Sequence, residues 1–179
     1  DDVGFSIVVE EHRQIVQRLL HRGPRPRSGG IGRGEVLRRV PVDVGENMKR
    51  GVLIDLLDKY NKNDILEVLG NFPGSSKPYI YITDVISAMR LLEKKMREGF
   101  SYYNVATLDH VNVKEIADIT TGMMGLKEVR YSYTGGDRGW KGDVPVVRLN
   151  SDKIRKLGWK SRYTSKEAIV RSISATYKG

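Results

Sequence analysis

The stretch “KPYIYITDVISAM” (residues 77–89) joins a strand pattern directly to a helix pattern. Its first part, “PYIYIT”, is rich in β-branched and aromatic residues, which predicts a strand with one tyrosine face packed in the core. Thr83 or Asp84 is then the expected N-cap of a helix whose apolar side chains gather on one face. The apolar residues of that face are Val85, Ile86, Met89, Leu92 and Met96.

Strands and helices alternate along the rest of the C-terminal part of the sequence. Strand patterns occupy residues 65–71, 101–107 and 127–134. Residues 50–63 have apolar side chains at helical spacing, and residues 151–158 form a short helix pattern that ends in glycine. The alternation predicts a small domain of the α/β (α+β) class with three or four short strands.

Two capping boxes predict further helix starts, because a cap residue and a glutamate three positions later satisfy each other's backbone N–H groups. Asn112 with Glu115 precedes a helix that should end at Gly125. Thr164 with Glu167 precedes the C-terminal helix. Both signals are local, so they predict where these helices begin independently of the rest of the fold.

The first 45 residues differ in composition from the domain predicted over residues 46–179. Nine of the ten basic residues up to Arg50 are arginine, whereas 13 of the 21 basic residues that follow are lysine. The tract “RGPRPRSGGIGRG” (residues 22–34) has no hydrophobic period, so it is expected to be disordered or loosely packed. After it, “GEVLRRVPVDVG” (residues 34–45) is a weak helix-then-strand pattern.

The glycines of “GGIGRGE” (residues 29–35) do not form a dinucleotide fingerprint. That fingerprint requires GxGxxG directly after a buried strand, so that backbone amides approach a pyrophosphate at the start of a helix. Here the spacing differs and an Arg/Pro-rich segment comes first. We interpret this segment as a flexible linker.

Composition limits the remaining function classes. A chain of 179 residues with 39% hydrophobic residues has enough material for one core and an appendage. The absence of cysteine excludes disulfides, thiolate metal sites and cysteine nucleophiles, and the three histidines are too far apart to predict a metal site. No apolar run approaches the roughly 18 residues that span a bilayer, and acidic residues stand near position 1, so a cytoplasmic protein without a membrane partner is expected.

The net charge of +9 favours an anionic partner but does not select one. Clustered lysine and arginine bind nucleic acid by releasing counterions from phosphate groups. A phosphorylated small molecule is another candidate, but the charge alone favours a solvated basic surface with no specific partner. The glycine-rich loop “TGGDRGWKGDVP” (residues 134–145) contains two aspartates, an arginine and a lysine, which suits a small anionic ligand.

Three motifs in order carry a resemblance to a known family. They are “KPYIYITDVISAM”, “YNVATLDHVNVKEIAD” (residues 103–118) and “GGDRGWKGDVPVVRLNSDKIRKLGWKS” (residues 135–161). Together they resemble the C-terminal half of an NAD-dependent nucleotide-sugar epimerase/dehydratase of the extended short-chain dehydrogenases, with UDP-glucose 4-epimerase as the most similar type. The resemblance covers residues 46–179 and implies a small substrate-binding domain without a complete Rossmann half.

The resemblance implies roles for two residues of the glycine-rich loop. Asp143, the aspartate of “GDVP”, corresponds to the family residue that accepts a hydrogen bond from a ribose hydroxyl. The family's diphosphate-binding arginine often lies three residues earlier, where this chain has Trp140. Arg138 and Lys141 are the alternatives for that role, and Arg138 is the expected ligand. A carboxylate suits vicinal hydroxyls and a cation suits phosphate oxygens.

Two further substrate residues are implied by the first half of the resemblance. Lys77 stands where a basic residue precedes the aromatic strand and meets the diphosphate. The family holds the uracil against the end of the strand “LEVLGN”, which implies contacts from Leu69 and from the backbone of Glu67. A plain core role for Leu69 remains an equal alternative.

The family's NAD site and catalytic pair have no counterpart in the sequence. Catalysis in the family uses YxxxK, in which the lysine lowers the pKa of the tyrosine phenol. The nearest spacing here is Tyr163 with Lys166, one residue short, and the GxxGxxG loop is absent. In the family's “RxxNxxG” segment, Val42 replaces the asparagine. The expectation is a truncated chain that is inactive and binds no NAD alone, with no catalytic and no cofactor-binding residue, unless another chain supplies that half.

Two functions from different classes are therefore predicted. The first is weak binding of a UDP-sugar by the epimerase-like domain, with homo-oligomerisation left open. The second is a basic module for nucleic acid or another partner that uses the arginines of residues 22–39. No aromatic residues interleave with those arginines, which weakens the second hypothesis.

Overall fold

The computed structural model of the chain describes residues 6–7, 35–39, 42–45, 55–56, 65–95, 101–139, 141 and 143–176. The strands within this part are β1 (Ser6–Ile7), β2 (Glu35–Arg39), β3 (Val42–Val44), β4 (Ile65–Val68), β5 (Ser76–Lys77), β6 (Tyr79–Tyr81), β7 (Ser101–Asn104), β8 (Val111–Asn112) and β9 (Arg130–Tyr133). The helices with described bounds are α3 (Ile82–Lys95), α4 (Val113–Met123), α5 (Asp152–Lys156) and α6 (Ser165–Thr176).

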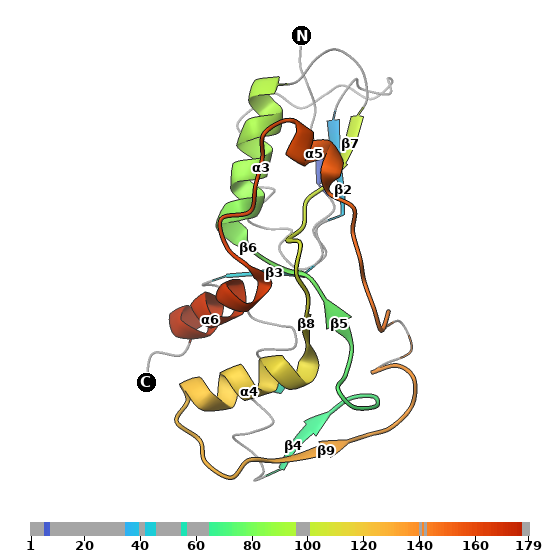
Figure 1. The fold of residues 1–179 in the computed structure, drawn as a ribbon, viewed down its shortest axis with the longest axis vertical. Helices are drawn as coiled ribbons and strands as arrows, with labels where there is room; N and C mark the ends of the chain where they lie inside the picture. Colours follow the sequence, from blue (N-terminus) through green and yellow to red (C-terminus); the bar gives the residue numbers. More distant parts are fainter. Residues whose placement is uncertain are drawn as a thin grey trace.

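Most of the strand pairs are parallel, which places the described part in the α/β (α+β) class predicted from the sequence. Strands β1, β2 and β7 form one parallel sheet, and β3–β6 and β4–β9 are separate parallel pairs. Strands β5 and β8 pair antiparallel. Figure 1 shows β2, β7 and α5 at one end of the molecule and α4, β4 and β9 at the other.

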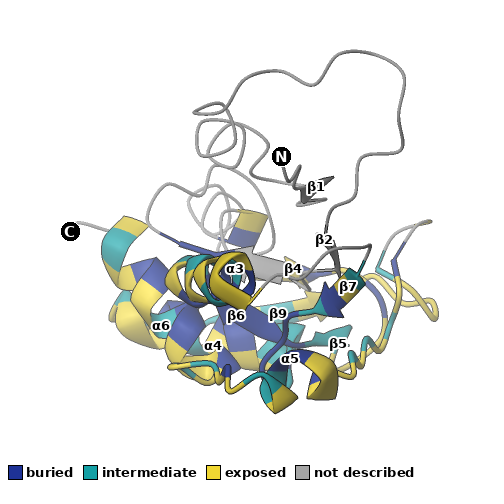
Figure 2. Cartoon of the chain, turned by 90° about the horizontal axis from the view of Figure 1, so that it is seen from above, coloured by how far each residue is buried: buried dark blue, intermediate teal, exposed yellow. Residues whose placement is uncertain are grey.

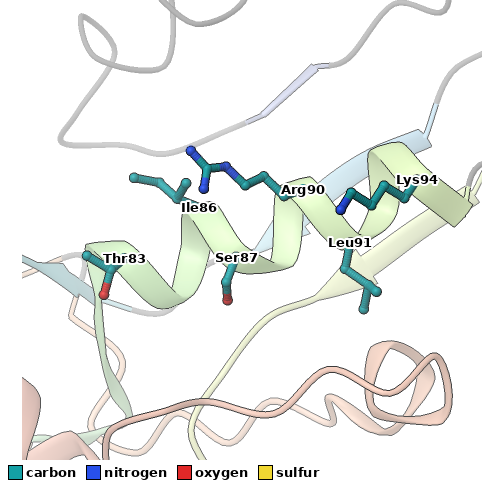
Figure 3. Close-up of a pocket in the computed structure, with 6 residues that line it drawn as sticks. All are labelled: Thr83, Ile86, Ser87, Arg90, Leu91 and Lys94. Carbon is teal, nitrogen blue, oxygen red and sulfur yellow. The ribbon is translucent and has the colours of Figure 1, made fainter.

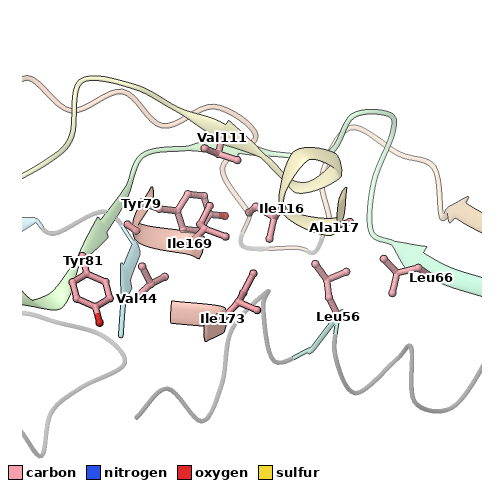
Figure 4. Packing of buried hydrophobic residues seen from close by; sticks show 11 residues of the cluster. Val44, Leu56, Leu66, Tyr79, Tyr81, Val111, Ile116, Ala117, Ile169 and Ile173 are labelled. Atoms are coloured by element: carbon pink, nitrogen blue, oxygen red, sulfur yellow. The ribbon is translucent and has the colours of Figure 1, made fainter. Parts of the chain in front are cut away.

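Strand β6 lies at the centre of the described core, with both of its faces buried. Tyr79 and Tyr81 pack into one hydrophobic cluster with residues of α4 and α6 (Figure 4). Ile80 packs into a second cluster with residues of α3 and α5. The prediction that the tyrosine face is buried is therefore confirmed, and the isoleucine face is buried as well because α3 covers it. Figure 2 shows the buried residues gathered on β6 and on one side of α6.

Helix α3 begins earlier than the sequence predicts. It starts at Ile82, so Thr83 and Asp84 lie in its first turn and the predicted N-cap is wrong. The side chain of Asp84 is buried and serves another segment: its Oδ2 accepts the backbone N–H groups of Arg162 (2.9 Å) and Tyr163 (3.1 Å). A short polar side chain such as that of Asp84 can cap its own helix. In this structure it instead accepts backbone donors of a segment that begins 78 residues further along the chain.

The two predicted capping boxes are confirmed. At α4, Asn112 Oδ1 accepts the N–H of Glu115 and Glu115 Oε2 accepts the N–H of Asn112, both at 2.9 Å. At α6, Glu167 Oε2 accepts the N–H of Thr164 at 2.8 Å and Thr164 Oγ1 accepts the N–H of Glu167 at 3.2 Å. Gly125, just beyond α4, has φ +68°, as expected for a glycine that ends a helix.

The start of α6 is also joined to the core by a buried hydroxyl. Ser165 Oγ accepts the backbone N–H of Tyr79 (2.9 Å) and shares a hydrogen bond with Thr107 Oγ1 (2.7 Å). The N–H of Ser165 donates to both carboxylate oxygens of Asp109. We call Ser165, Thr107 and Asp109 the α6 hub.

Two other expectations need correction. Residues 35–39 form a strand, although the sequence pattern predicts a helix there, because their backbone pairs with β1 on one side and β7 on the other. Within residues 46–179, the described part of the chain also forms six short strands, β4 to β9, where three or four were predicted. Within the helix predicted over residues 50–63, only Asp55 and Leu56 are described, and both are helical. The tract at residues 22–34 lies outside the described residues.

Candidate functional site

Two loops meet beside the parallel pair formed by β4 and β9. The strands pair in register from Ile65 opposite Arg130 to Val68 opposite Tyr133. Parallel strands end at the same edge of a sheet, so the loops that follow them emerge side by side. The first loop begins at Leu69, and the second is the glycine-rich loop at residues 134–145 that the sequence singled out for an anionic ligand.

Backbone hydrogen bonds interlock the two loops. The N–H of Gly70 donates to Thr134 Oγ1 (2.9 Å), and the N–H of Gly135 donates to the carbonyl of Gly70 (3.1 Å). One residue further, the N–H of Asn71 donates to the carbonyl of Gly136 (3.0 Å). These bonds fix the path of both loops without using any charged side chain.

Glycine at position 70 is required by this close approach. Its φ is +87°, a left-handed conformation that side chains disfavour. A Cβ atom there would also lie 3.3 Å from the carbonyl carbon of Arg138 and from the nitrogen of Gly139. Glycine therefore allows the backbone of the second loop to pass directly over the first.

The second loop then runs back along β5 and brings two predicted site residues together. The N–H of Ser76 donates to the carbonyl of Pro145 (2.7 Å), and the N–H of Val147 donates to the carbonyl of Ser76 (3.1 Å). Lys77 Nζ consequently lies 2.5 Å from Asp143 Oδ1. The other carboxylate oxygen, Oδ2, accepts the N–H of Gly139 at 3.2 Å. The Asp143 side chain is only 3% exposed, whereas that of Lys77 is 21% exposed.

The interlocked loops enclose a cleft of about 210 Å³. Its lining residues are Leu69, Gly70, Asn71, Phe72, Gly74, Ser75, Asp137, Arg138, Gly139, Asp143 and Pro145. Three of the four predicted substrate residues, Leu69, Arg138 and Asp143, thus lie on one cleft, and the fourth, Lys77, contacts Asp143. The alternative that Leu69 is a core residue is wrong, because Leu69 is 41% exposed.

The charges around the cleft balance one another. Lys77 and Asp143 form an ion pair, and Arg138 and Asp137 both line the opening. Binding of an anionic ligand therefore depends more on where each charged group lies than on the net charge around the cleft. Arg138 is exposed, and within the described part of the chain it has no ion-pair partner. Lys141, the alternative to Arg138, is exposed but does not line the cleft.

Sequence reasoning missed two features of this site. Phe72 lines the cleft with 69% of its surface exposed, although a single phenylalanine in the turn-rich segment between Asn71 and Pro73 attracted no functional prediction. An aromatic residue in a polar turn was the available signal. The pairing of Lys77 with Asp143 was also missed, because both were expected to face the ligand and the sequence contains no signal that brings positions 66 residues apart together.

A second, larger hollow of about 500 Å³ follows one side of α3 (Figure 3). It is lined by Thr83, Ile86, Ser87, Arg90, Leu91 and Lys94, which recur at helical spacing. None of the predicted substrate residues lines it. Ser87 there accepts a hydrogen bond from Trp159 Nε1 at 2.9 Å, which ties α3 to the segment after α5.

The described residues do not fit an NAD site. A dinucleotide's pyrophosphate needs a glycine-rich turn between a strand and the helix that follows it. Strand β6 passes directly into α3, and β8 passes directly into α4, with no glycine at either junction. The same part of the chain contains no group of three metal-ligating side chains and no helix long and apolar enough to cross a membrane.

Comparison with solved structures identifies the class of protein to which this fold corresponds. A UDP-galactose 4-epimerase is similar at 29% identity with a TM-score of 0.66, over 80% of this chain and 45% of that chain. MoeE5 in complex with UDP-glucuronic acid and NAD is similar at 20% identity with a TM-score of 0.67, over 83% and 48% of the two chains. A dTDP-glucose 4,6-dehydratase from Bacillus anthracis in complex with NAD is similar at 16% identity with a TM-score of 0.66, over 79% and 44%.

The chain thus has the fold of part of a nucleotide-sugar epimerase or dehydratase, and the resemblance stated from its motifs is confirmed. It spans about half the length of the structures it matches. No protein-family model and no curated protein matches the sequence.

Proposed function

We propose that residues 46–179 bind a nucleotide-sugar, with the nucleoside diphosphate in the cleft between the two interlocked loops. Arg138 and Lys77 would contact the diphosphate, Asp143 a ribose hydroxyl, and Leu69 the base. The observation that carries the proposal is that Leu69, Arg138 and Asp143, from different segments of the sequence, line one cleft of about 210 Å³, with Lys77 paired to Asp143 beside it. Similar structures with bound UDP-sugars give further support.

The ion pair between Lys77 and Asp143 still leaves bonding capacity for a ligand. An ammonium group has three donors and a carboxylate has about four acceptor sites. Of these, Asp143 uses one on Lys77 and one on the N–H of Gly139. Because the carboxylate is buried, contact with a ribose requires Asp143 to become more exposed, whereas Arg138 is already exposed. Arg138 is therefore the first point of contact for the diphosphate.

Binding is expected to be weak. Ligand sites commonly have volumes of about 300–1,000 Å³, and the cleft, at about 210 Å³, is smaller. It encloses only part of a nucleoside diphosphate, and its charges balance. We expect an affinity for UDP on the order of millimolar, or about −4 kcal/mol.

Titration of the full chain with UDP, followed by protein chemical shifts, tests the proposal. We expect shifts at Leu69, Lys77 and in the loop at residues 137–143. Arg138→Ala should weaken binding about 10- to 150-fold, because a charge-assisted hydrogen bond contributes about 1.5–3 kcal/mol. Lys141→Ala is the matched control, since it removes a cation from the same loop but outside the cleft, and it should leave the affinity unchanged.

The result would contradict the proposal if UDP shifted no signal around the cleft. A loss of affinity in Lys141→Ala with none in Arg138→Ala would instead assign the diphosphate contact to the other basic residue. The same titration with a DNA duplex tests the nucleic-acid alternative, for which we find no support in the comparisons. Binding of DNA with a steep salt dependence, and without cleft shifts, would favour that alternative.

Activity and cofactor binding are tested separately. We expect the purified chain to show no affinity for NAD and no conversion of UDP-glucose to UDP-galactose, because the sequence lacks both the GxxGxxG loop and the YxxxK pair. Detectable turnover by the purified chain would contradict this expectation. UDP binding does not depend on that result, since the cleft residues all lie within the described part of this chain.

A further inference from the structure

Phe72 is an exposed aromatic residue on the rim of the cleft. Its exposed fraction is 69%, and it lines the cleft together with Leu69 and Arg138. Isolated exposed apolar residues are common on protein surfaces, so exposure alone indicates nothing. The position is informative because Phe72 is exposed, is held in place by its neighbours and lines a candidate ligand site.

Hydrogen bonds hold the backbone on both sides of Phe72. Before it, the N–H of Asn71 donates to the carbonyl of Gly136 (3.0 Å), and the carbonyl of Asn71 accepts the N–H of Gly74 (2.7 Å). After it, the carbonyl of Pro73 accepts the N–H of Lys114 (3.0 Å). The residue is therefore anchored to the glycine-rich loop and to the first turn of α4.

The ring of Phe72 is supported from one side by Tyr133. The two ring centroids lie 5.6 Å apart with an interplanar angle of 73°, an edge-to-face arrangement that aromatic pairs prefer. Tyr133 is half-buried and its hydroxyl is buried, so its ring is held against the molecule. A phenylalanine held in this way loses little conformational freedom when a ligand stacks on it.

The cleft thus presents two kinds of group to one ligand. Phe72 and Leu69 offer exposed apolar surface, Arg138 offers an exposed cation, and Gly70 and Gly139 line the same cleft. A flat aromatic group that carries a nearby anionic group matches this arrangement. A nucleoside diphosphate has both parts, and stacking of a base on an aromatic side chain tolerates any base.

We propose that Phe72 is a ligand-binding residue that stacks on the base of the bound nucleoside diphosphate. This inference rests on the proposed function and adds that the base is held mainly by stacking, so that Phe72 contributes affinity without selecting among bases. The anionic tail then projects toward Arg138 at the opening.

Ligand and protein signals are followed by NMR during titration of the wild-type chain and three variants with UDP and with inorganic pyrophosphate. In the wild type, we expect ring-current shifts of the uracil protons. Phe72→Ala should abolish these shifts and weaken UDP binding about tenfold, while pyrophosphate binding stays unchanged. Phe72→Tyr should keep both. Leu108→Ala, which removes another exposed apolar residue (73% exposed) outside the cleft, should behave as wild type.

The outcomes distinguish the two proposals. If the wild type gives no shifts with UDP, the proposed function fails and the stacking role fails with it. If the wild type binds UDP but Phe72→Ala binds it equally well and keeps the uracil shifts, only the stacking role is overturned. Equal losses for UDP and pyrophosphate in Phe72→Ala would also overturn it, because they would indicate a purely structural effect.

Discussion

The cleft and the α6 hub both join segments that are distant in sequence, but they do so with different groups. At the hub, side-chain oxygens satisfy buried backbone donors, as Ser165 Oγ does for the N–H of Tyr79. At the cleft, backbone groups of the two loops bond to each other at glycines, and the ion pair of Lys77 with Asp143 joins β5 to the second loop. Removing a polar atom from the hub should therefore lower the free energy of unfolding. At the cleft, adding a carbon atom to a glycine should lower it.

The largest effect should come from adding one carbon beside the cleft, in Gly74→Ala. The φ of Gly74 is +86°, and a Cβ atom there would lie 2.7 Å from the Cβ of Val113. The left-handed conformation costs about 1–2 kcal/mol, and overpacking adds about 1–3 kcal/mol. We expect the free energy of unfolding, measured in urea, to fall by about 2–5 kcal/mol.

Gly125→Ala is the matched control for this prediction. Gly125 also has a positive φ, +68°, but nothing lies within 4 Å of its added Cβ. Only the conformational cost of about 1–2 kcal/mol should remain. Equal losses of stability in the two variants would mean that the close approach of Gly74 to Val113 adds nothing to the cost of the substitution. The proposed contrast between the cleft and the hub would then be wrong.

The second prediction removes a polar atom from the hub, in Ser165→Ala. The N–H of Tyr79 then loses its buried hydroxyl acceptor, and the hydroxyl of Thr107 loses one of its partners and retains the carbonyl of Asp109. Leaving a buried donor unsatisfied costs about 1–3 kcal/mol. The free energy of unfolding should fall by this amount in urea denaturation.

Ser174→Ala on the same helix is its control. Ser174 is exposed, and its hydroxyl bonds only to the carbonyl of Val170 within α6. Alanine is a better helix former than serine, so this variant should be neutral or slightly stabilised. If both serine variants lost the same stability, the effect would belong to the helix and not to the hub.

The same contrast explains how much of the fold was predictable from the sequence. The capping boxes at Asn112 and Thr164 depend on residues three positions apart, so both helix starts were predicted correctly. The strand at residues 35–39 depends on pairing with β1 and β7, and its local pattern pointed to a helix. The start of α3 was wrong for the same reason, because Asp84 binds a distant segment.

The candidate site was predictable only in its parts. Family resemblance supplied Leu69, Lys77, Arg138 and Asp143, and three of these line the cleft. The resemblance did not supply Phe72. Nor did it supply the ion pair, which exists because the run from Pro145 to Val147 follows β5. Contacts of this kind arise from the path of the backbone, which no local sequence pattern specifies.

The third prediction tests whether the burial of Asp84 at the start of α3 makes the free energy of unfolding depend on pH. Burial raises the pKa of Asp84, although the backbone N–H groups of Tyr163 and Arg162 oppose this shift. A carboxyl group with a raised pKa binds protons more tightly in the folded state, so stability falls as pH rises from the unfolded pKa to the folded one. Asp84→Asn keeps an acceptor oxygen but does not titrate.

Relative to the wild type, Asp84→Asn should therefore gain stability as pH rises through that interval and then keep a constant difference. Urea denaturation at a series of pH values measures this directly. Asp84→Ala, which leaves both N–H groups without an acceptor, should be less stable than the wild type at every pH. A difference between wild type and Asp84→Asn that did not change with pH would show that burial leaves this carboxylate unaffected.

The smallest effect should come from Glu167, which accepts the next backbone N–H along the chain, that of Thr164. Here the N–H and hydroxyl of Thr164 lower the pKa of an exposed carboxylate. Its stabilisation is present above the unfolded pKa and is lost as pH falls through the folded one. Glu167→Gln should thus differ most from the wild type at neutral pH and converge with it in acid, the opposite slope to Asp84→Asn. Asp84 and Glu167 together accept the N–H groups of three successive residues, so their pKa shifts would differ in sign only because Asp84 is buried. Parallel changes of stability with pH in the two variants would contradict that explanation.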